Sequence, residues 1–232
     1  MKTKLFAACV LFALAGCDIS GIRGNGHIVT REEKLDPFIN VDTGGAFRID
    51  WRSGPPAVSV TTDENLMQYL EMEVRDQVLY VRTTRNIRPS HSIRLALTSN
   101  ALEGASFSGA SQLTAHQLTG SRFYLETTGA SKATLDGAVD ELVANLTGAS
   151  NLRAESLQTK TANVSVTGAG NAQIAVSDSL KVSITGAGKV EYIGNPPHLE
   201  REITGAGSIR PRGGSLSSGP TVLGHSHDTP HQ

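Results

Sequence analysis

Apolar and polar residues alternate through the second half of the chain in short segments, and the pattern recurs about every nineteen residues. Each segment is bounded by a tetrapeptide of the form Ser/Thr-Gly-Ala-Ser/Gly. Six evenly spaced copies predict a solenoid, because a fixed period of this length is typical of stacked repeats. The copies begin at Ser108, Thr128, Thr147, Thr167, Thr185 and Thr204, at intervals of 20, 19, 20, 18 and 19 residues.

Each repeat predicts at least two β-strands. On the amino-terminal side of each tetrapeptide, apolar residues occupy alternate positions with polar residues between them, as in Leu142, Ala144 and Leu146. On its carboxyl-terminal side, equivalent positions hold a large apolar residue in one repeat and a small one in the next, as in Leu113 and Ala133. A period of two is that of a strand with one buried face, and no repeat has a helical period. Stacked about 4.8 Å apart, such strands form a parallel β-helix, and nineteen residues leave room for a third strand in each rung.

The glycine of each tetrapeptide predicts a sharp corner between strands. Glycine is favoured where the backbone needs a positive φ or where neighbouring backbones crowd together. The residue before it is always Ser or Thr, so stacked corners would carry a ladder of hydroxyls along one edge. The predicted structural corner glycines are Gly109, Gly129, Gly148, Gly168, Gly186 and Gly205.

The first half of the chain predicts further strands rather than a separate unit. No break in composition divides it from the repeats, so we expect one domain over residues 37–212. Asp63 precedes a short run that reads as one turn of helix, which its side chain would cap. The expected strands, separated by Gly, Pro and Asn, are Phe38–Val41, Ala46–Trp51, Ala57–Thr61, Val78–Arg82 and Ile93–Leu97.

The amino terminus predicts export and a lipid anchor. Lys2 and Lys4 precede a short apolar run, which is typical of a secretory signal too short to span a bilayer. The sequence Leu14-Ala15-Gly16-Cys17 resembles the bacterial lipobox, which implies cleavage before Cys17 and acylation of its thiol. Residues 1–16 are then the signal peptide, 17–36 a lipidated cysteine with a flexible tether, and 213–232 a disordered tail. The acyl chains on Cys17 would insert into the membrane, which is therefore an expected partner. The protein is expected to be lipid-anchored to the cell envelope, facing the periplasm or the surface.

Several stretches together resemble the head GIN domain family of bacterial adhesins. They are Phe38-Ile39-Asn40-Val41, Ala46-Phe47-Arg48-Ile49, the stretch from Val58 to Leu66, Val78-Leu79-Tyr80-Val81 and the six glycine corners. The resemblance covers about 175 residues. It implies a right-handed parallel β-helix related in shape to pectin lyases, and a role in adhesion rather than catalysis.

Composition and motifs offer little enzymatic chemistry. A net charge of −1 gives no electrostatic reason to expect a nucleic-acid partner. Nucleophile motifs, metal-ligand spacings and phosphate loops are missing, so we assign no catalytic residue, metal or cofactor. His225, His227 and His231 could take up a transition metal, but nothing in the tail would hold them in place.

One outward column is the candidate binding face. It consists of Gln112, Lys132, Asn151, Asn171 and Lys189, which follow the corners in successive repeats. The acids Asp136, Asp140, Glu141 and Asp178 fall at irregular positions and are not expected to form a catalytic pair.

Three functional hypotheses follow from this pattern. The first is a non-catalytic module that binds a glycan or protein ligand through its extended face. The second is a structural envelope component that assembles as a homo-oligomer. The third is a degenerate polysaccharide-acting enzyme, which a cluster of three or more charged side chains on one face would favour.

Overall fold

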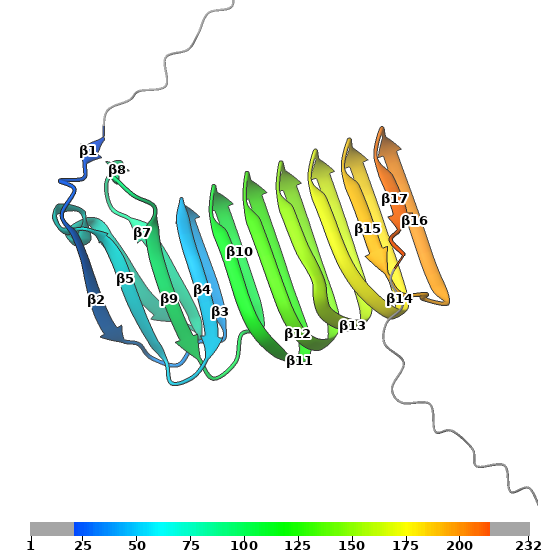
Figure 1. The fold of residues 1–232 in the computed structure, drawn as a ribbon, viewed down its shortest axis with the longest axis horizontal. Coiled ribbons are helices and arrows are strands. Elements are labelled where there is room, and N and C mark those ends of the chain that lie inside the picture. The colour runs from blue at the N-terminus through cyan, green and yellow to red at the C-terminus, as the bar shows by residue number, and fades with distance from the viewer. Residues whose placement is uncertain (1–20, 214–232) are drawn as a thin grey trace, which may run out of the picture.

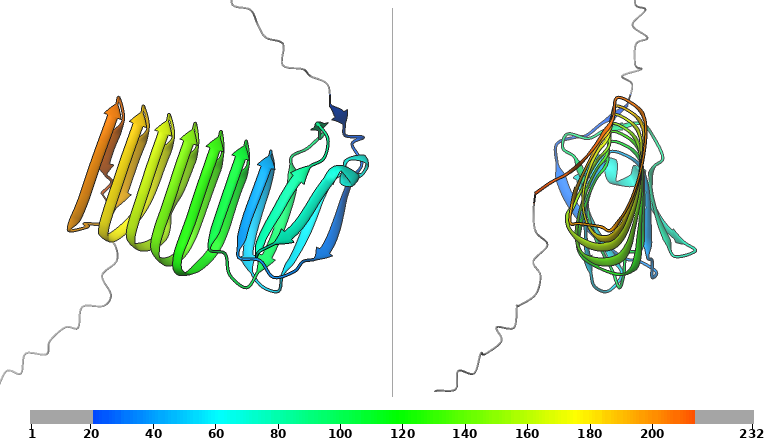
Figure 2. Two further views of the ribbon diagram at one scale, coloured as in Figure 1. Left: turned by 180° about the vertical axis from the view of Figure 1, so that it is seen from behind. Right: turned by 90° about the vertical axis from the view of Figure 1, so that its right-hand side faces the viewer.

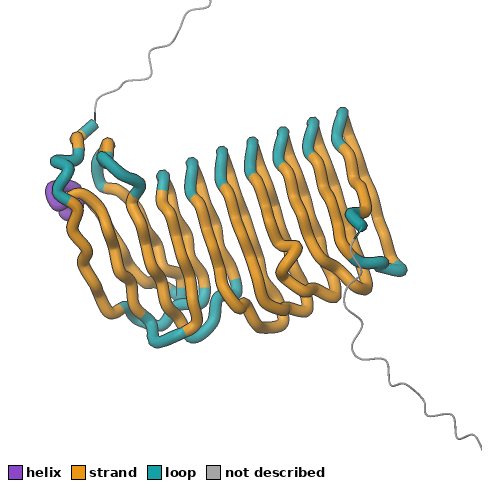
Figure 3. The backbone as a smooth tube through the Cα atoms, in the orientation of Figure 1, coloured by secondary structure: helices purple, strands orange, loops and turns teal. Residues whose placement is uncertain are grey.

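The computed structural model describes residues 21–213, which form one β-solenoid whose coils stack along a single axis (Figure 1). Strands make up nearly all of each coil, and the loops are short and gathered at the turns (Figure 3). No helix within the described part of the chain has the length and apolar character needed to span a membrane. The predicted parallel β-helix with rungs of about nineteen residues is confirmed.

A complete coil is one long strand that bends through a wide turn and ends at a glycine corner. In β12 (Lys132–Gly148) the first half pairs on one side of the solenoid and the second half on the other. Seen end-on, the coils superimpose as a flattened oval (Figure 2). Each full coil therefore has two long paired segments, and between them the wide turn holds a short paired run, such as Leu118–Gly120 with Gly137–Val139, where nineteen residues left room for a third strand.

We call the surface built by the segments that follow a corner sheet 1, and the surface built by the segments that lead into a corner sheet 2. All pairings are parallel except β2–β5, β5–β9 and β6–β7. A separate pair joins β1 (Ile22–Arg23) to β8 (Ile87–Arg88). Sheet 1 runs β2 (Ile28–Lys34), β5 (Ala57–Asp63), β9 (Ile93–Ser99), β4 (Phe47–Ser53), the first halves of β11 (Gln112–Gly129), β12, β13 (Asn151–Gly168) and β14 (Asn171–Gly186), β15 (Lys189–Ile193) and β17 (Ser208–Pro211). Sheet 2 runs β6 (Leu70–Arg75), β7 (Val78–Thr83), β3 (Asn40–Gly45), β10 (Gly104–Gly109), the second halves of β11–β14, and β16 (His198–Gly205).

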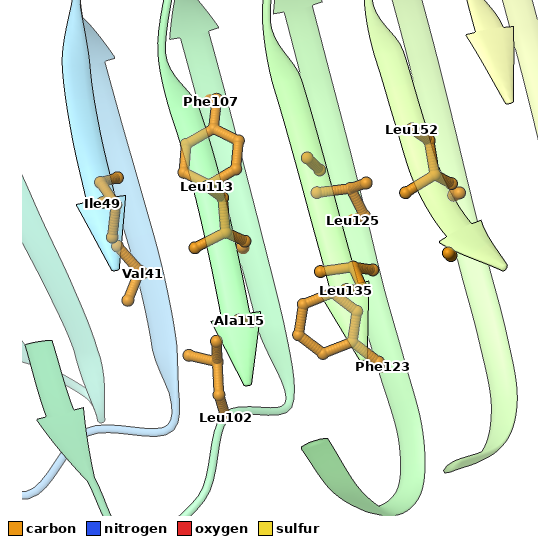
Figure 4. Packing of buried hydrophobic residues seen from close by; sticks show 14 of the residues in the cluster. Val41, Ile49, Leu102, Phe107, Leu113, Ala115, Phe123, Leu125, Leu135 and Leu152 are labelled. Carbon is orange, nitrogen blue, oxygen red and sulfur yellow. The ribbon is translucent and has the colours of Figure 1, made fainter. Parts of the chain in front are cut away.

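The core is a thin apolar layer between the two sheets. Leu113, Ala133, Leu152 and Ala172 stand in register in one column, so over these four coils a large residue alternates with a small one. Side chains from the two sheets meet in the middle of the oval (Figure 4). Each fully buried Leu, Ile or Val contributes about 1.5–3 kcal/mol, so the stacked columns order the described coils by packing.

The predicted corner glycines all have positive φ, from +97° to +118°. At each corner the alanine that follows donates its backbone N–H to the glycine carbonyl of the preceding coil, at 2.8 or 2.9 Å. A Cβ at Gly148 would lie 2.4 Å from the carbonyl oxygen of Gly129. Both this close backbone contact and the positive φ therefore favour glycine at the position. Gly45, at φ +139°, begins the same ladder and forms a corner that the tetrapeptide pattern does not reveal.

The predicted strands of the first half are present with small shifts, but the predicted tether is wrong over its described part, residues 21–36. The strand expected at Phe38–Val41 forms two residues later as β3, and β6 was not expected at all. Within the predicted tether, Ile28–Lys34 forms β2 along the edge of β5. The reason is a set of long-range hydrogen bonds that fix the preceding loop, including Asn25 N–H to Asn65 Oδ1 at 2.9 Å.

Asp63 fastens this amino-terminal end instead of capping a helix. The segment Glu64–Tyr69 is a 3-10 helix, η1, and the Asp63 carboxylate makes no capping bond to it. That carboxylate is buried and accepts from Gly26 N–H at 2.8 Å, Ser90 N–H at 2.9 Å and Ser90 Oγ at 2.6 Å. Burial raises the pKa of Asp63, but these donors outweigh it and hold the pKa below its ordinary value.

Candidate binding face

The five residues of the predicted binding column lie in one continuous row on sheet 1. Each is the in-register partner of the next on the neighbouring coil. The row extends beyond the prediction, because Arg48 pairs with Gln112, Arg94 pairs with Arg48, and Ser208 pairs with Lys189. At about 4.8 Å per strand the whole row is on the order of 34 Å long.

The carboxyl-terminal half of the row is neutral or internally paired. Asn171 donates its side-chain amide to Asn151 Oδ1 at 3.1 Å, which links two coils. Lys189 forms an ion pair with Glu191, and Gln173 donates to the same carboxylate at 3.0 Å. These two donors, the lysine first, hold the pKa of Glu191 below its ordinary value. A shallow hollow of about 220 Å³ lies over these residues.

The amino-terminal half of the row is basic. Arg48 and Arg94 line a second hollow of about 320 Å³, together with Ser59, Thr61 and Thr114. These hydroxyls come from β5 and β11, so the hollow spans the place where the repeats meet the first half of the chain.

The two sheets differ in whether their outward cations are ion-paired. On sheet 2 the outward cations are ion-paired with carboxylates of the same sheet: Arg75 with Glu73, Arg82 with Asp42, Arg122 with Glu141, and Lys181 with Glu200. On sheet 1, Arg48, Arg94, Lys132 and Arg153 form no ion pair within residues 21–213. Sheet 1 therefore presents positive charge that the described fold does not neutralise.

One titratable cluster on sheet 1 was missed by the sequence analysis. His116 Nδ1 lies 3.0 Å from Asp136 and its Nε2 lies 3.5 Å from Asp50. Asp136 also accepts the backbone N–H of Gln117 at 2.6 Å, and Gln117 has a positive φ of 54°. Arg52 binds Asp50 at 3.1 Å. The groups satisfy one another and brace the bend of β11.

The wide turn opposite the corners holds another hollow, of about 360 Å³. It forms where β13 carries extra residues that shift its register against β14. The buried hydroxyl of Thr159 donates to the Ala175 carbonyl at 2.7 Å, and Lys160 pairs with Asp140 at 2.8 Å at the rim. The turn is lined mainly by small neutral residues.

Two sets of predicted groups fall outside residues 21–213. Cys17 and the histidines of the tail lie outside the described residues. Among residues 21–213, no group of three or more His, Cys, Asp or Glu side chains is arranged to hold a metal ion.

Comparison with solved structures supports the fold. The crystal structure of a putative adhesin from Bacteroides fragilis is 19% identical with a TM-score of 0.70, over 83% of this chain and 100% of that chain. A putative lipid binding protein from Parabacteroides distasonis is 20% identical with a TM-score of 0.56, over 84% and 100%. A putative adhesin from Parabacteroides merdae is 20% identical with a TM-score of 0.55, over 83% and 99%. At these identities the likeness concerns the fold alone.

Sequence comparison identifies the family. No curated, characterised protein matches the chain. The family described as "Putative auto-transporter adhesin, head GIN domain" matches residues 37–196. The solenoid extends past this match at both ends, with β2 before it and β16 and β17 after it. The resemblance stated from the sequence is confirmed, and the chain belongs to the head GIN domain family.

Proposed function

We propose that this protein is a non-catalytic attachment module of the bacterial cell envelope, and that it binds its ligand along the sheet 1 row. One observation carries the proposal: exposed and half-buried polar side chains are aligned in register over the length of the solenoid, with cations that the fold leaves unpaired. Stacked repeats present equivalent positions as a long surface, which suits many shallow contacts more than one deep site. Many copies on one membrane would gain affinity by multivalency.

The charged cluster at His116 argues for structure rather than catalysis. Its two carboxylates are already engaged, by the imidazole, by Arg52 and by the Gln117 amide. No Ser, Thr or Cys nucleophile is hydrogen-bonded to His116 in the described part of the chain. We therefore expect no turnover of polygalacturonate by the purified protein above a heat-denatured control. Release of shortened uronate chains would favour the degenerate-enzyme alternative.

The open end of the solenoid argues against end-to-end self-assembly. In the last coil, Arg201 of β16 takes the inward position that Val182 holds in the coil before. Pro211 ends β17 and has no N–H to donate to another strand. Inward-pointing charges and edge prolines are common devices against edge-to-edge pairing. A stable oligomer of the purified full chain would favour the structural alternative.

The anchor gives one testable prediction. Cys17→Ser should abolish incorporation of labelled fatty acid, because the Cys17 thiol is the proposed point of acylation. The serine variant should accumulate as an uncleaved or soluble exported form. Cys9→Ser, which removes the other cysteine of the chain, should leave labelling intact. Unchanged labelling of the Cys17 variant would end the lipoprotein proposal.

The binding face gives a second prediction. Asn151→Glu with Asn171→Glu places two bulky charges in the middle of the row, and should reduce attachment of cells that carry the full chain by at least tenfold. The melting temperature should fall only slightly, because both side chains are exposed, although the two glutamates face each other in register and lose the hydrogen bond between Asn151 and Asn171. The matched control is Asn145→Glu with Ser165→Glu, which are in-register partners at outward positions of sheet 2. Equal attachment by the two double variants would contradict the assignment of sheet 1.

A further inference from the structure

Two arginines face the same way on neighbouring strands without a counterion. Arg48 of β4 and Arg94 of β9 are in-register partners, and both are exposed. Parallel strands lie about 4.8 Å apart, and like charges directly opposite one another destabilise a sheet. Within residues 21–213 neither guanidinium has a hydrogen bond or ion pair to any carboxylate. Such a pair costs the fold stability unless an anion binds between the two guanidinium groups.

The surroundings of the pair do not supply that anion. Asp50 lines the same hollow, but Arg52 and His116 already engage its two oxygens, at 3.1 and 3.5 Å. The other nearby carboxylate of sheet 1 is Glu32, which stands on β2 opposite Ser59 and is separated from β9 by β5. Hydroxyls of Ser59, Thr61 and Thr114 and the amide of Gln112 complete the lining. The hollow thus offers two cations and several neutral hydrogen-bonding groups.

Further cations follow along the same row. Lys132 lies two coils beyond Arg48, with Gln112 between them, so the two cations are about 10 Å apart. Arg153 stands on the next coil, in the outward column beside the row. The amides of Asn151 and Asn171 continue the row. Charge is therefore spaced along the solenoid axis, with neutral groups between.

From this arrangement we infer that sheet 1 binds a linear acidic polysaccharide, whose carboxylate or sulfate groups are held by Arg48 and Arg94 and, further along, by Lys132. The inference rests on the proposed function and names the ligand class of the same face. Guanidinium groups bind planar and tetrahedral oxyanions with paired hydrogen bonds. The amides and hydroxyls between the cations suit the hydroxyls of sugar units.

The same row is a poor surface for nucleic acid. Single strands are bound by stacking bases on aromatic side chains. The outward positions of sheet 1 in the described strands hold no Phe, Tyr or Trp, and Trp51 points into the core. A polymer recognised here must therefore rely on charge and hydrogen bonds.

The test compares two double variants of the full chain, purified in detergent and immobilised. Arg48→Gln with Arg94→Gln removes the unpaired arginines. The matched control, Arg122→Gln with Lys181→Gln, removes the same charge from sheet 2, where both cations are ion-paired. The probes are polygalacturonate, dextran sulfate, neutral dextran, single-stranded DNA, and phosphatidylcholine vesicles with and without phosphatidylglycerol. Binding is measured at low and high salt, with the melting temperature of each variant.

We expect polygalacturonate or dextran sulfate to bind the wild type and to weaken as salt rises, because exposed charges are screened. The sheet 1 variant should lose at least tenfold in affinity and the control less than twofold. The melting temperature of the sheet 1 variant should stay the same or rise slightly as the repulsion is removed. Neutral dextran should bind no better to the wild type than to the variant.

Three results would overturn the inference. They are equal losses in both double variants, preference for anionic vesicles or DNA over both acidic polysaccharides, and binding of neutral dextran as tightly as of dextran sulfate. If no polysaccharide binds while attachment of cells still depends on Asn151 and Asn171, the ligand class is wrong and the proposed function stands. If attachment is also insensitive to those two residues, the proposed function fails with it.

Discussion

Gly148→Val is expected to lower the free energy of unfolding by about 3–5 kcal/mol. Gly148 has φ +97°, a conformation that a β-branched residue resists. Its new Cβ would also lie 2.4 Å from the Gly129 carbonyl oxygen, which is the acceptor for Ala149 N–H at 2.8 Å. The valine must therefore break the corner ladder or separate the two coils. Chemical denaturation followed by circular dichroism measures the loss.

Substitutions at two other glycines distinguish the cost of the backbone conformation from the cost of the steric clash. Gly120→Ala meets a positive φ of +138° with nothing within 4 Å of the new Cβ, so it should cost about 1–2 kcal/mol from conformation alone. Gly213→Val has open space and no positive φ, and should cost nothing measurable. Equal stability of the three variants would contradict the stacked-corner structure.

Asp63→Asn is expected to cost about 2–3 kcal/mol at neutral pH, because three donors lose a charged acceptor at a buried position. Gly26 N–H and both Ser90 donors face this carboxylate, and Asn would turn its amide group toward at least one of them. The amino-terminal loop and the loop around Ser90 would both loosen. Hydrogen exchange should accordingly speed up at Gly26 and Ser90 before it does so in β12.

The contribution of Asp63 to stability depends on pH, because its pKa is lowered by folding. The pKa of Asp63 is lower in the folded protein than its ordinary value of 3.8, so folding favours the ionised form. Its contribution is present in full well above pH 3.8 and is lost as the pH falls through the lowered folded-state value. The difference in stability between wild type and Asp63→Asn should shrink over that acid range. A constant difference at every pH would contradict a stabilising role for the ionised carboxylate.

The repeats could be predicted well because one local rule fixes them. Alternation decides which side chains point inward, and a glycine every nineteen residues or so fixes the register between coils. The row through Gln112, Lys132 and Asn151 was predictable for this reason. The pairing of His116 with Asp136 was within reach too, since they lie 20 residues apart, one coil further along.

The first half could be predicted less well because its contacts are not periodic. Arg48 lies beside Arg94 because β4 pairs with β9 although β5, η1, β6, β7 and β8 lie between them in the sequence. No spacing in the sequence reveals that neighbour. The segment before residue 36 looks like a tether by composition, and only the distant acceptors Asp63 and Asn65 hold it to the domain. The corner at Gly45 was missed because Gly44 replaces the usual Ser or Thr and Phe47 replaces the usual Ser or Gly.

The central claim, attachment through an outward-facing domain, is tested most directly by antibody labelling of cells that express the full chain. We predict that an antibody raised against residues 21–213 labels intact cells as strongly as cells whose outer layers have been permeabilised. Protease added to intact cells should remove the same signal. Labelling that appears only after permeabilisation would place the domain inside the envelope and contradict the account.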